Sequence, residues 1–331
     1  MKELYLVTGA AGHLGSTIVR QLLKLEKSIR ILVLPEEKNI PQGEFEVFYG
    51  DVCDKEDLKA FFNNPQKKEL IVIHCAGIVS VATKYVKKVY DVNVTGTKNV
   101  VDISLEKRVK KLVYVSSVHA IPEKAKGETI TEVSQFNPED VLGFYSKTKA
   151  EASSYVLAAI KKGLNANIVH PSGIAGPFDH GKGLLTALAI DYYQGQLTSG
   201  VNGGYDFVDV RDVAGGIIAC CEKGRSGQSY ILSNEYFTIR EILFMLHEIT
   251  GKKEITRFLP LWFLKLIAAP AEIYYKILKR PPLFTANSIS IINSNAKFSH
   301  QKASAELGYT TRDMKETLID TINWLKENKR L

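Results

Sequence analysis

Residues 8–15 read TGAAGHLG and are the strongest indication of the fold. This stretch follows an apolar strand pattern at 4–7 and opens a helix pattern whose apolar positions recur every three or four residues. Glycines at 9, 12 and 15 allow a tight turn and a close approach of the backbone to a pyrophosphate, and the helix N-terminus offers unpaired N–H donors. The motif therefore predicts a dinucleotide site; the alternative is a glycine-rich turn without a ligand.

Strand-like and helix-like segments keep alternating after this motif. Further strand patterns lie at 29–34, 45–48, 70–74, 112–115 and 165–169, and helix patterns lie at 14–25, 55–62, 85–106 and 138–162. This alternation implies parallel strands joined by right-handed crossovers. We predict an α/β fold with a Rossmann-type, doubly wound parallel sheet, whose ligands bind beyond the carboxyl ends of the strands.

The alternation loosens after Pro171. Two more strand patterns occur at 205–208 and 229–232, and the chain from 237 onward is mainly helical. We therefore predict an NAD(P)-binding domain at 1–175, with late strands from about 205 to 235. A smaller, mainly helical substrate-binding lobe is expected at 176–204 and 236–331.

Composition and charge describe an ordinary globular enzyme. Hydrophobic residues make up 45% of the 331 residues, and the net charge of +7 comes from dispersed basic residues, so no nucleic-acid partner is expected. The four cysteines show no metal-binding spacing, which predicts a reducing compartment and no metal site. No apolar run reaches ~18 residues and the N-terminus enters a strand directly, so a cytoplasmic protein without a membrane span is expected.

Residues after the second and third strands bear on the cofactor. Leu34 stands where an acid would hold both ribose hydroxyls of NAD, so NADP is favoured and NAD stays possible, because Glu36 and Glu37 follow closely. Lys38 could pair with one of these acids. Asp51 is placed to accept a hydrogen bond from the adenine amino group, the alternative being a cap for the next helix.

The fourth strand ends in small residues, Cys75-Ala76-Gly77, which let a flat ring or a ribose lie against the backbone. Cys75 is expected to pack rather than react, because no cation is evident that would lower the pKa of its thiol. His74 is expected to be a structural histidine.

Tyr145 and Lys149 are four residues apart in a helix pattern and so share one face. A phenol with a reference pKa near ~10 is a poor base at neutral pH, and each unit of depression requires about 1.4 kcal/mol. A fixed ammonium one turn away, together with the positive ring of an oxidised nicotinamide, would supply that energy. A chance surface pairing is the alternative.

In their order and spacing these motifs resemble the extended short-chain dehydrogenase/reductase superfamily, the NAD-dependent epimerase/dehydratase group. The resemblance also rests on NVTGT at 93–97, Ser116-Ser117, PSGIAGP at 171–177 and FVDVRDVA at 207–214, and it covers nearly the whole chain. It implies that NAD(P) contacts Gly9, Ala11, Gly12, His13, Leu14, Gly15, Asp51, Val52, Cys75, Ala76, Gly77, Tyr145, Lys149, Pro171 and Ile174.

The resemblance also implies catalytic roles. Tyr145 would be the general acid/base, Lys149 would lower its pKa and hold the nicotinamide ribose, and Ser117 would hydrogen-bond the reacting oxygen. Ser116 takes that role if the register differs by one. Asn93 would support the lysine through a proton-relay water.

Within the superfamily the chain looks more like dihydroflavonol reductases and 3β-hydroxysteroid dehydrogenases than like sugar-nucleotide enzymes. Val118-His119 stands where sugar-nucleotide dehydratases usually carry an Asp-Glu pair, so elimination chemistry is not expected. His119 and His170 are candidate substrate contacts, with a structural or solvated histidine as the alternative for each.

The resemblance thus predicts an oxidoreductase that interconverts a secondary alcohol and a ketone or aldehyde on a small to medium, largely apolar substrate. The alternatives are a sugar-nucleotide epimerase with tightly bound cofactor and, from another class, a non-catalytic nucleotide-sensing or scaffold protein. The apolar segment 259–275 is expected to be a core or lid helix, with interfacial membrane contact as the alternative. A homodimer through the helices bearing Asn93 and Tyr145 would use apolar positions such as Ala150, Ala152, Val156, Leu157 and Ile160.

Overall fold

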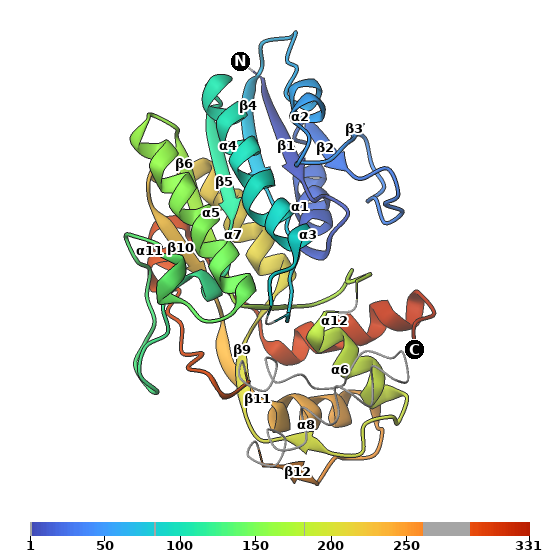
Figure 1. Cartoon of the computed structure of the whole chain (residues 1–331). Helices are drawn as coiled ribbons and strands as arrows, with labels where there is room; N and C mark the ends of the chain where they lie inside the picture. Colours follow the sequence, from blue (N-terminus) through green and yellow to red (C-terminus); the bar gives the residue numbers. More distant parts are fainter. Residues whose placement is uncertain (1, 83, 182, 261–291) are drawn as a thin grey trace.

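The computed structural model describes residues 2–82, 84–181, 183–260 and 292–331. Within these ranges seven parallel strands form one sheet in the order β10-β6-β5-β4-β1-β2-β3 (Figure 1). The strands are β1 (Glu3–Thr8), β2 (Ile29–Val33), β3 (Glu46–Tyr49), β4 (Glu69–His74), β5 (Lys111–Val115), β6 (Ala166–Pro171) and β10 (Ser229–Leu232). The strand order runs outward in both directions from β1, which confirms the predicted doubly wound Rossmann-type sheet.

Helices cover both faces of this sheet (Figure 1). On one face lie α1 (His13–Lys24), α7 (Val210–Lys223) and α11 (Gln301–Leu307), and on the other lie α2 (Lys55–Phe61), α4 (Thr97–Glu106) and α5 (Phe144–Lys161). Successive β1 residues point to opposite faces, so Leu4 and Leu6 join one apolar core while Tyr5 and Val7 join the other. Burial on both faces explains why the strand reads as a continuous apolar run.

The helix predicted at 85–106 is interrupted by a wider turn. It consists of α3 (Lys87–Tyr90), a π-helical turn at Asp91–Gly96 and α4. A π turn inserts an extra residue and often re-aims a side chain at a functional site. Gly96 is needed where the helix passes the third-strand loop, because a Cβ there would lie 2.6 Å from Val52 Cγ2.

A second body lies beyond the carboxyl ends of the large sheet (Figure 1). It contains a three-stranded sheet in the order β11-β9-β7 and the strand pair β12-β8. Its strands are β7 (Gly173–Ala175), β8 (Gly200–Val201), β9 (Gly204–Asp209), β11 (Glu235–Thr238) and β12 (Phe258–Leu259), and its helices are α6 (Leu184–Tyr193), α8 (Ile239–Thr250) and α12 (Met314–Glu327). These elements share one apolar core, which fits a separate lobe.

Three segments depart from the predicted boundaries. Of the two late strands, β10 joins the large sheet but β9 pairs with β7 and β11 in the small one. β7, placed within the predicted NAD(P)-binding domain, therefore belongs to the small sheet. Helix α11, placed within the predicted lobe, packs on α7 and β10 of the large sheet instead. The division into an NAD(P)-binding domain and a substrate-binding lobe stays a prediction.

Two predictions concerned the surface, namely the apolar segment 259–275 and a homodimer interface on α5. Of the apolar segment 259–275 only residues 259 and 260 lie within the described ranges. The apolar positions of α5 that would serve a homodimer interface pack in the protein's own core: Ala150, Ala152 and Val156 are buried, and Leu157 and Ile160 pack against them. Ala150, Ala152 and Val156 are therefore not open to a partner, and the homodimer stays a prediction.

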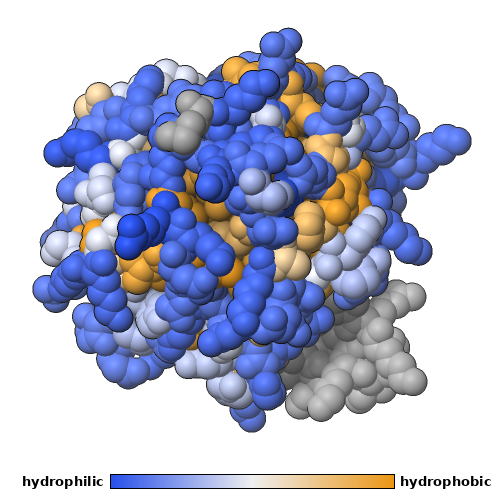
Figure 2. Space-filling model, turned by 90° about the horizontal axis from the view of Figure 1, so that it is seen from above, coloured by the Kyte–Doolittle hydropathy of each residue, from blue (hydrophilic) through white to orange (hydrophobic). Residues whose placement is uncertain are grey.

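The surface itself is mainly hydrophilic where the strands of the large sheet begin, with apolar residues between the polar ones (Figure 2). No helix in the described part of the chain is long and apolar enough to cross a membrane.

Candidate active site

The glycine turn between β1 and α1 leaves backbone donors uncovered. Gly9 adopts a left-handed φ of 69°, and a Cβ there would lie 2.7 Å from Ala76 N. Gly12 caps α1 without a side-chain hydrogen bond, and the first turn of α1 contains no acidic residue. A helix start of this kind favours an anion, so the turn fits a pyrophosphate.

Several predicted cofactor residues pack against the apolar cluster that contains residues of β1 and α1. Ala11, Leu14, Cys75 and Ile174 are partly buried against the same apolar cluster, and Pro171 is buried at the end of β6. His13 differs, because its ring Nε2 lies 2.9 Å from the Pro177 carbonyl oxygen. The Nε2 atom of His13 is thus engaged within the protein.

Asp51 and Val52, which follow β3, make contacts with nearby parts of the chain. Asp51 Oδ1 accepts a hydrogen bond from Cys53 N at 2.9 Å. The side chain of Asp54, rather than that of Asp51, caps α2, so the helix-cap alternative for Asp51 is wrong. Val52 is buried in the apolar core between α2 and α4.

Small residues open the end of β4 toward helix α5. A Cβ at Gly77 would lie 3.2 Å from Lys149 Nζ, so a larger residue would crowd that ammonium. Burial raises the pKa of Cys75 to about 12, which agrees with a packing role for this thiol. His74 bonds Thr8 through Nδ1 at 2.7 Å and Thr97 through Nε2 at 3.0 Å and is structural, as predicted.

Helix α5 carries Tyr145 and Lys149 one turn apart. Lys149 is buried and its Nζ donates to the Val115 carbonyl oxygen at 2.9 Å. Burial lowers the pKa of Lys149 to about 8 and raises that of Tyr145 to about 12, the latter opposed by a hydrogen bond with Ser117. Lys149 was predicted to lower the pKa of the phenol. Without a cofactor the phenol pKa is raised instead, because burial is the largest influence on it.

The two serines after β5 separate clearly. Ser116 Oγ lies 2.8 Å from Ser153 Oγ in the interior, whereas Ser117 Oγ accepts the His119 N–H at 3.2 Å and meets the Tyr145 phenol. Ser117 is therefore the serine that the fold brings to Tyr145. Ser116, the alternative one residue earlier, contacts Ser153 of α5 instead of Tyr145.

Asn93 sits in the π-helical turn and is fully buried. Its Oδ1 accepts the Ile78 N–H at 2.7 Å, and its Nδ2 donates to the Ile78 carbonyl at 3.0 Å and to Thr148 Oγ1 at 3.1 Å. Both amide hydrogens are thus used to tie the loop after β4 to α5. The proton-relay role stays a prediction that this side chain's bonds do not favour.

The two candidate substrate histidines have different surroundings. His170 is buried and its Nδ1 lies 3.0 Å from the Ser117 carbonyl oxygen, which makes it structural. His119 is partly exposed, and its Nε2 lies 3.1 Å from the hydroxyl of Tyr205. Sequence reasoning missed Tyr205 as a site residue, since nothing in its strand pattern separates it from a core tyrosine.

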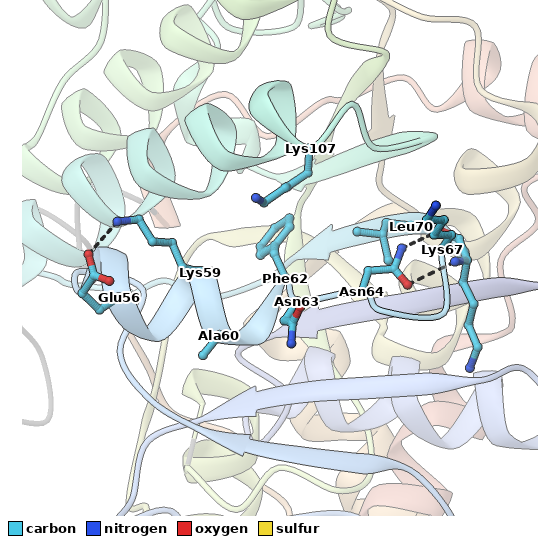
Figure 3. A pocket seen from close by; sticks show the side chains of 10 residues that line it. Glu56, Lys59, Ala60, Phe62, Asn63, Asn64, Lys67, Leu70 and Lys107 are labelled. Atoms are coloured by element: carbon cyan, nitrogen blue, oxygen red, sulfur yellow. Dashed lines mark hydrogen bonds and ion pairs between the residues drawn. The ribbon is translucent and has the colours of Figure 1, made fainter.

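A depression of about 770 Å³ elsewhere is lined by Glu56, Lys59, Ala60, Phe62, Asn63, Asn64, Lys67, Lys68, Leu70 and Lys107 (Figure 3). It lies where α2 and α4 end and β4 begins, at the edge of the sheet opposite to Tyr145. Helix C-termini stabilise nearby cations, which accounts for lysines at this place. The lining of the depression does not include Ser117, Tyr145 or Lys149.

Comparison with known proteins gives the family. The family model described as NAD dependent epimerase/dehydratase matches residues 5–233. The chain is 29% identical to "Sterol demethylase protein B" of Methylococcus capsulatus, covering 97% of this chain and 98% of that protein. It is also 29% identical to a "Putative dihydroflavonol 4-reductase" of Synechocystis sp., covering 99% and 96% of the two chains.

Among solved structures, UDP-glucose 4-epimerase of Thermotoga maritima matches with a TM-score of 0.76 at 20% identity, over 98% of this chain and 99% of that one, which speaks for the fold alone. The family match spans more than half of the chain and includes the glycine turn, Ser117, Tyr145 and Lys149. The chain therefore belongs to the NAD dependent epimerase/dehydratase family and is an NAD(P)-dependent enzyme of the short-chain dehydrogenase/reductase superfamily.

Proposed function

We propose that this enzyme interconverts a secondary alcohol and a ketone on a small to medium, largely apolar substrate. The observation that carries the proposal is the convergence of Tyr145, Ser117 and Lys149 at the carboxyl end of β5, beside the small residues that end β4. A sensor or scaffold needs no such acid–base set.

The residues divide the work as follows. The glycine turn, Lys149 and the small residues that end β4 would hold a reduced nicotinamide cofactor, which would supply a hydride to the carbonyl carbon. Tyr145 gives its phenolic proton to the carbonyl oxygen, and Ser117 donates a hydrogen bond to the same oxygen. With a pKa of about 12 the phenol is protonated at neutral pH, which suits proton donation to a ketone. Lys149 lies close enough to Gly77 to reach a ribose placed against the end of β4.

NADP is proposed as the preferred cofactor, because Leu34 directly follows the last residue of β2 and brings no carboxylate to the ribose. We expect NADPH to bind more tightly than NADH, and Leu34→Asp to shift this preference toward NADH by about tenfold or more, since a carboxylate would face the 2′-phosphate. Fluorescence titration with both cofactors measures it. Leu34→Asn is the control, because asparagine has nearly the size of aspartate but carries no charge. A wild type that prefers NADH tenfold would assign the ribose to Glu36 or Glu37.

An apolar substrate is supported by the relatives, whose names refer to a sterol and a dihydroflavonol. Two described basic residues that could hold a diphosphate are engaged apart from each other and form no shared cluster: Arg225 pairs with Glu306 at the far edge of the sheet, and Arg240 lies 3.7 Å over the ring of Phe258. Lys182 lies outside the described residues. A sugar-nucleotide epimerase would need such a cluster.

We expect binding to follow apolar burial. Each added methylene on a ketone should tighten binding by up to ~0.8 kcal/mol until the pocket is filled. Calorimetry at saturating cofactor tests this with a ketone series, and with UDP and UDP-sugars as the competing ligands. Micromolar binding of UDP alone would demonstrate a diphosphate site and make the epimerase the better proposal.

A further inference from the structure

The ammonium of Lys149 is buried with little polar compensation. Within the described part of the chain its Nζ donates to the Val115 carbonyl oxygen at 2.9 Å and forms no ion pair with a carboxylate. Burial disfavours the charged form of an amine unless nearby groups favour the charge. One carbonyl oxygen is a small compensation, so a further source of negative potential is expected beside this side chain.

The titratable groups around Lys149 do not supply it. His74 and Cys75 lie near it at the end of β4, His170 lies near it on β6, and Tyr145 precedes it by one turn of α5. Burial lowers the pKa of His74 to about 3 and that of His170 to about 4, and it raises the pKa of Cys75 and of Tyr145 to about 12. All four groups are therefore uncharged near pH 7.

The face of an aromatic ring lies next to the ammonium instead. Lys149 Nζ stands over the ring of Tyr114, 5.2 Å from its centroid. Tyr114 belongs to β5 and packs in the apolar core on the sheet face that α5 covers. The ring is fully buried, and burial raises the pKa of its phenol, which stays neutral. The negative face of a ring attracts a cation within about 6 Å, and more strongly where both groups are shielded from water.

A stack with a neighbouring strand fixes this ring. His74 is paired with Tyr114 across β4 and β5, and the two rings lie 5.7 Å apart with planes 26° apart. His74 is itself bonded to Thr8 and Thr97. The ring of Tyr114 is thus oriented by the sheet and can present its face to Lys149 without rearrangement.

Two other lysines lie over tyrosine rings but differ in their charge partners. Lys27 lies over Tyr5 and Lys98 over Tyr155, each 5.6 Å from the ring centroid. Both are partly exposed and pair with glutamates, so neither depends on the ring for its charge. Lys149 combines burial, the absence of a described carboxylate partner and an oriented ring face.

We propose that the π face of Tyr114 holds the Lys149 ammonium in its charged form and directs it toward the end of β4. Tyr114 is then a positioning residue, because it acts through Lys149 and not on the reacting atoms. The use of this charge in binding a cofactor and in the reaction rests on the function proposed above. The contact between the ring and the ammonium does not rest on it.

Direct titration of Lys149 tests the contact. Lysine labelled with carbon-13 at Cε is followed by NMR as the pH is raised, and Lys149→Met identifies the signal. The wild type is compared with Tyr114→Phe and with chains that carry 3,5-difluorophenylalanine or pentafluorophenylalanine in place of Tyr114. Fluorine withdraws electron density from the ring face with little change in size. We expect the pKa of Lys149 to stay within about 0.3 unit in Tyr114→Phe and to fall stepwise with fluorination, by about one unit for the pentafluoro ring.

Tyr5 is the matched control, because it is also fully buried in the large sheet but lies beside Lys27. The same fluorinated residues in place of Tyr5 should leave the pKa of Lys149 unchanged. The proposal would be overturned if neither fluorinated ring at Tyr114 lowered the pKa of Lys149, or if the rings at Tyr5 lowered it equally.

A kinetic measurement separates this inference from the proposed function. Loss of the Lys149 proton should limit kcat/KM at alkaline pH, so the alkaline limb of the profile should move to lower pH by the shift that NMR records. A limb that stays in place while the pKa falls would support the contact with Tyr114 and contradict the role of Lys149 in the proposed function.

Discussion

Tyr145→Phe should lower turnover at least ~100-fold while the fold and the cofactor affinity stay as in the wild type. The phenol, which meets Ser117, is the proton donor of the proposed reaction, and a positioned acid–base group contributes about 10²–10⁴-fold. Phenylalanine keeps the ring that packs edge-on against His119, so the variant removes only the hydroxyl. Steady-state kinetics with a ketone and NADPH, together with a cofactor titration, measure both parts.

Tyr155→Phe is the matched control for this variant. Tyr155 lies on the same helix, but its hydroxyl donates to Asp102 Oδ1 at 2.6 Å, away from the catalytic set. The control should keep turnover within about threefold. Near-normal activity of Tyr145→Phe would remove the tyrosine from the mechanism.

Lys149→Met should damage turnover and cofactor binding together. The ammonium lies within reach of Gly77 at the end of β4 and donates to the Val115 carbonyl, so its loss removes a ribose contact and leaves a buried acceptor unpaired. We expect turnover to fall by about 100-fold and the cofactor Kd to rise by about tenfold or more. Intact cofactor affinity in the variant would contradict the ribose contact.

The same variant has a stability signature. Because burial lowers the pKa of Lys149 from 10.5 to about 8, the unfolded state binds more protons than the folded state between these values. The free energy of unfolding of the wild type should therefore rise between about pH 8 and 10.5, by about 3 kcal/mol relative to Lys149→Met. Denaturant unfolding at several pH values measures this difference. Lys147→Met, which replaces a side chain that is 42% exposed and pairs with Glu139, is the surface control.

The framework of the fold could be predicted from local patterns in the sequence. Continuous apolar runs and 3.6-residue periods are local signals, and they located the strands of the large sheet and most helices to within a few residues. The glycine turn could also be predicted. Neighbouring backbone atoms lie so close to Gly9 and Gly15 that a side chain would not fit, so these positions require glycine. Tyr145 and Lys149 could be paired from spacing alone, since helix geometry places residues four apart on one face.

The resemblance to the short-chain dehydrogenase/reductase superfamily rested on the order of such local motifs, and the family match confirms it. Cofactor choice and substrate could not be fixed in the same way. They depend on which side chains line the site, and no local sequence pattern reports this.

The tertiary structure decided which side chains meet. Only the packed β5–α5 interface shows that Ser116 turns to Ser153 while Ser117 meets Tyr145, a choice that two adjacent serines leave open in the sequence. The pairing of His119 with Tyr205 joins residues 86 positions apart, which no local pattern encodes. Burial raises the pKa of Tyr145 and lowers that of Lys149, whereas the spacing of the two residues had predicted a lowered phenol pKa. Desolvation depends on all the atoms that surround a group, and spacing reports only one neighbour.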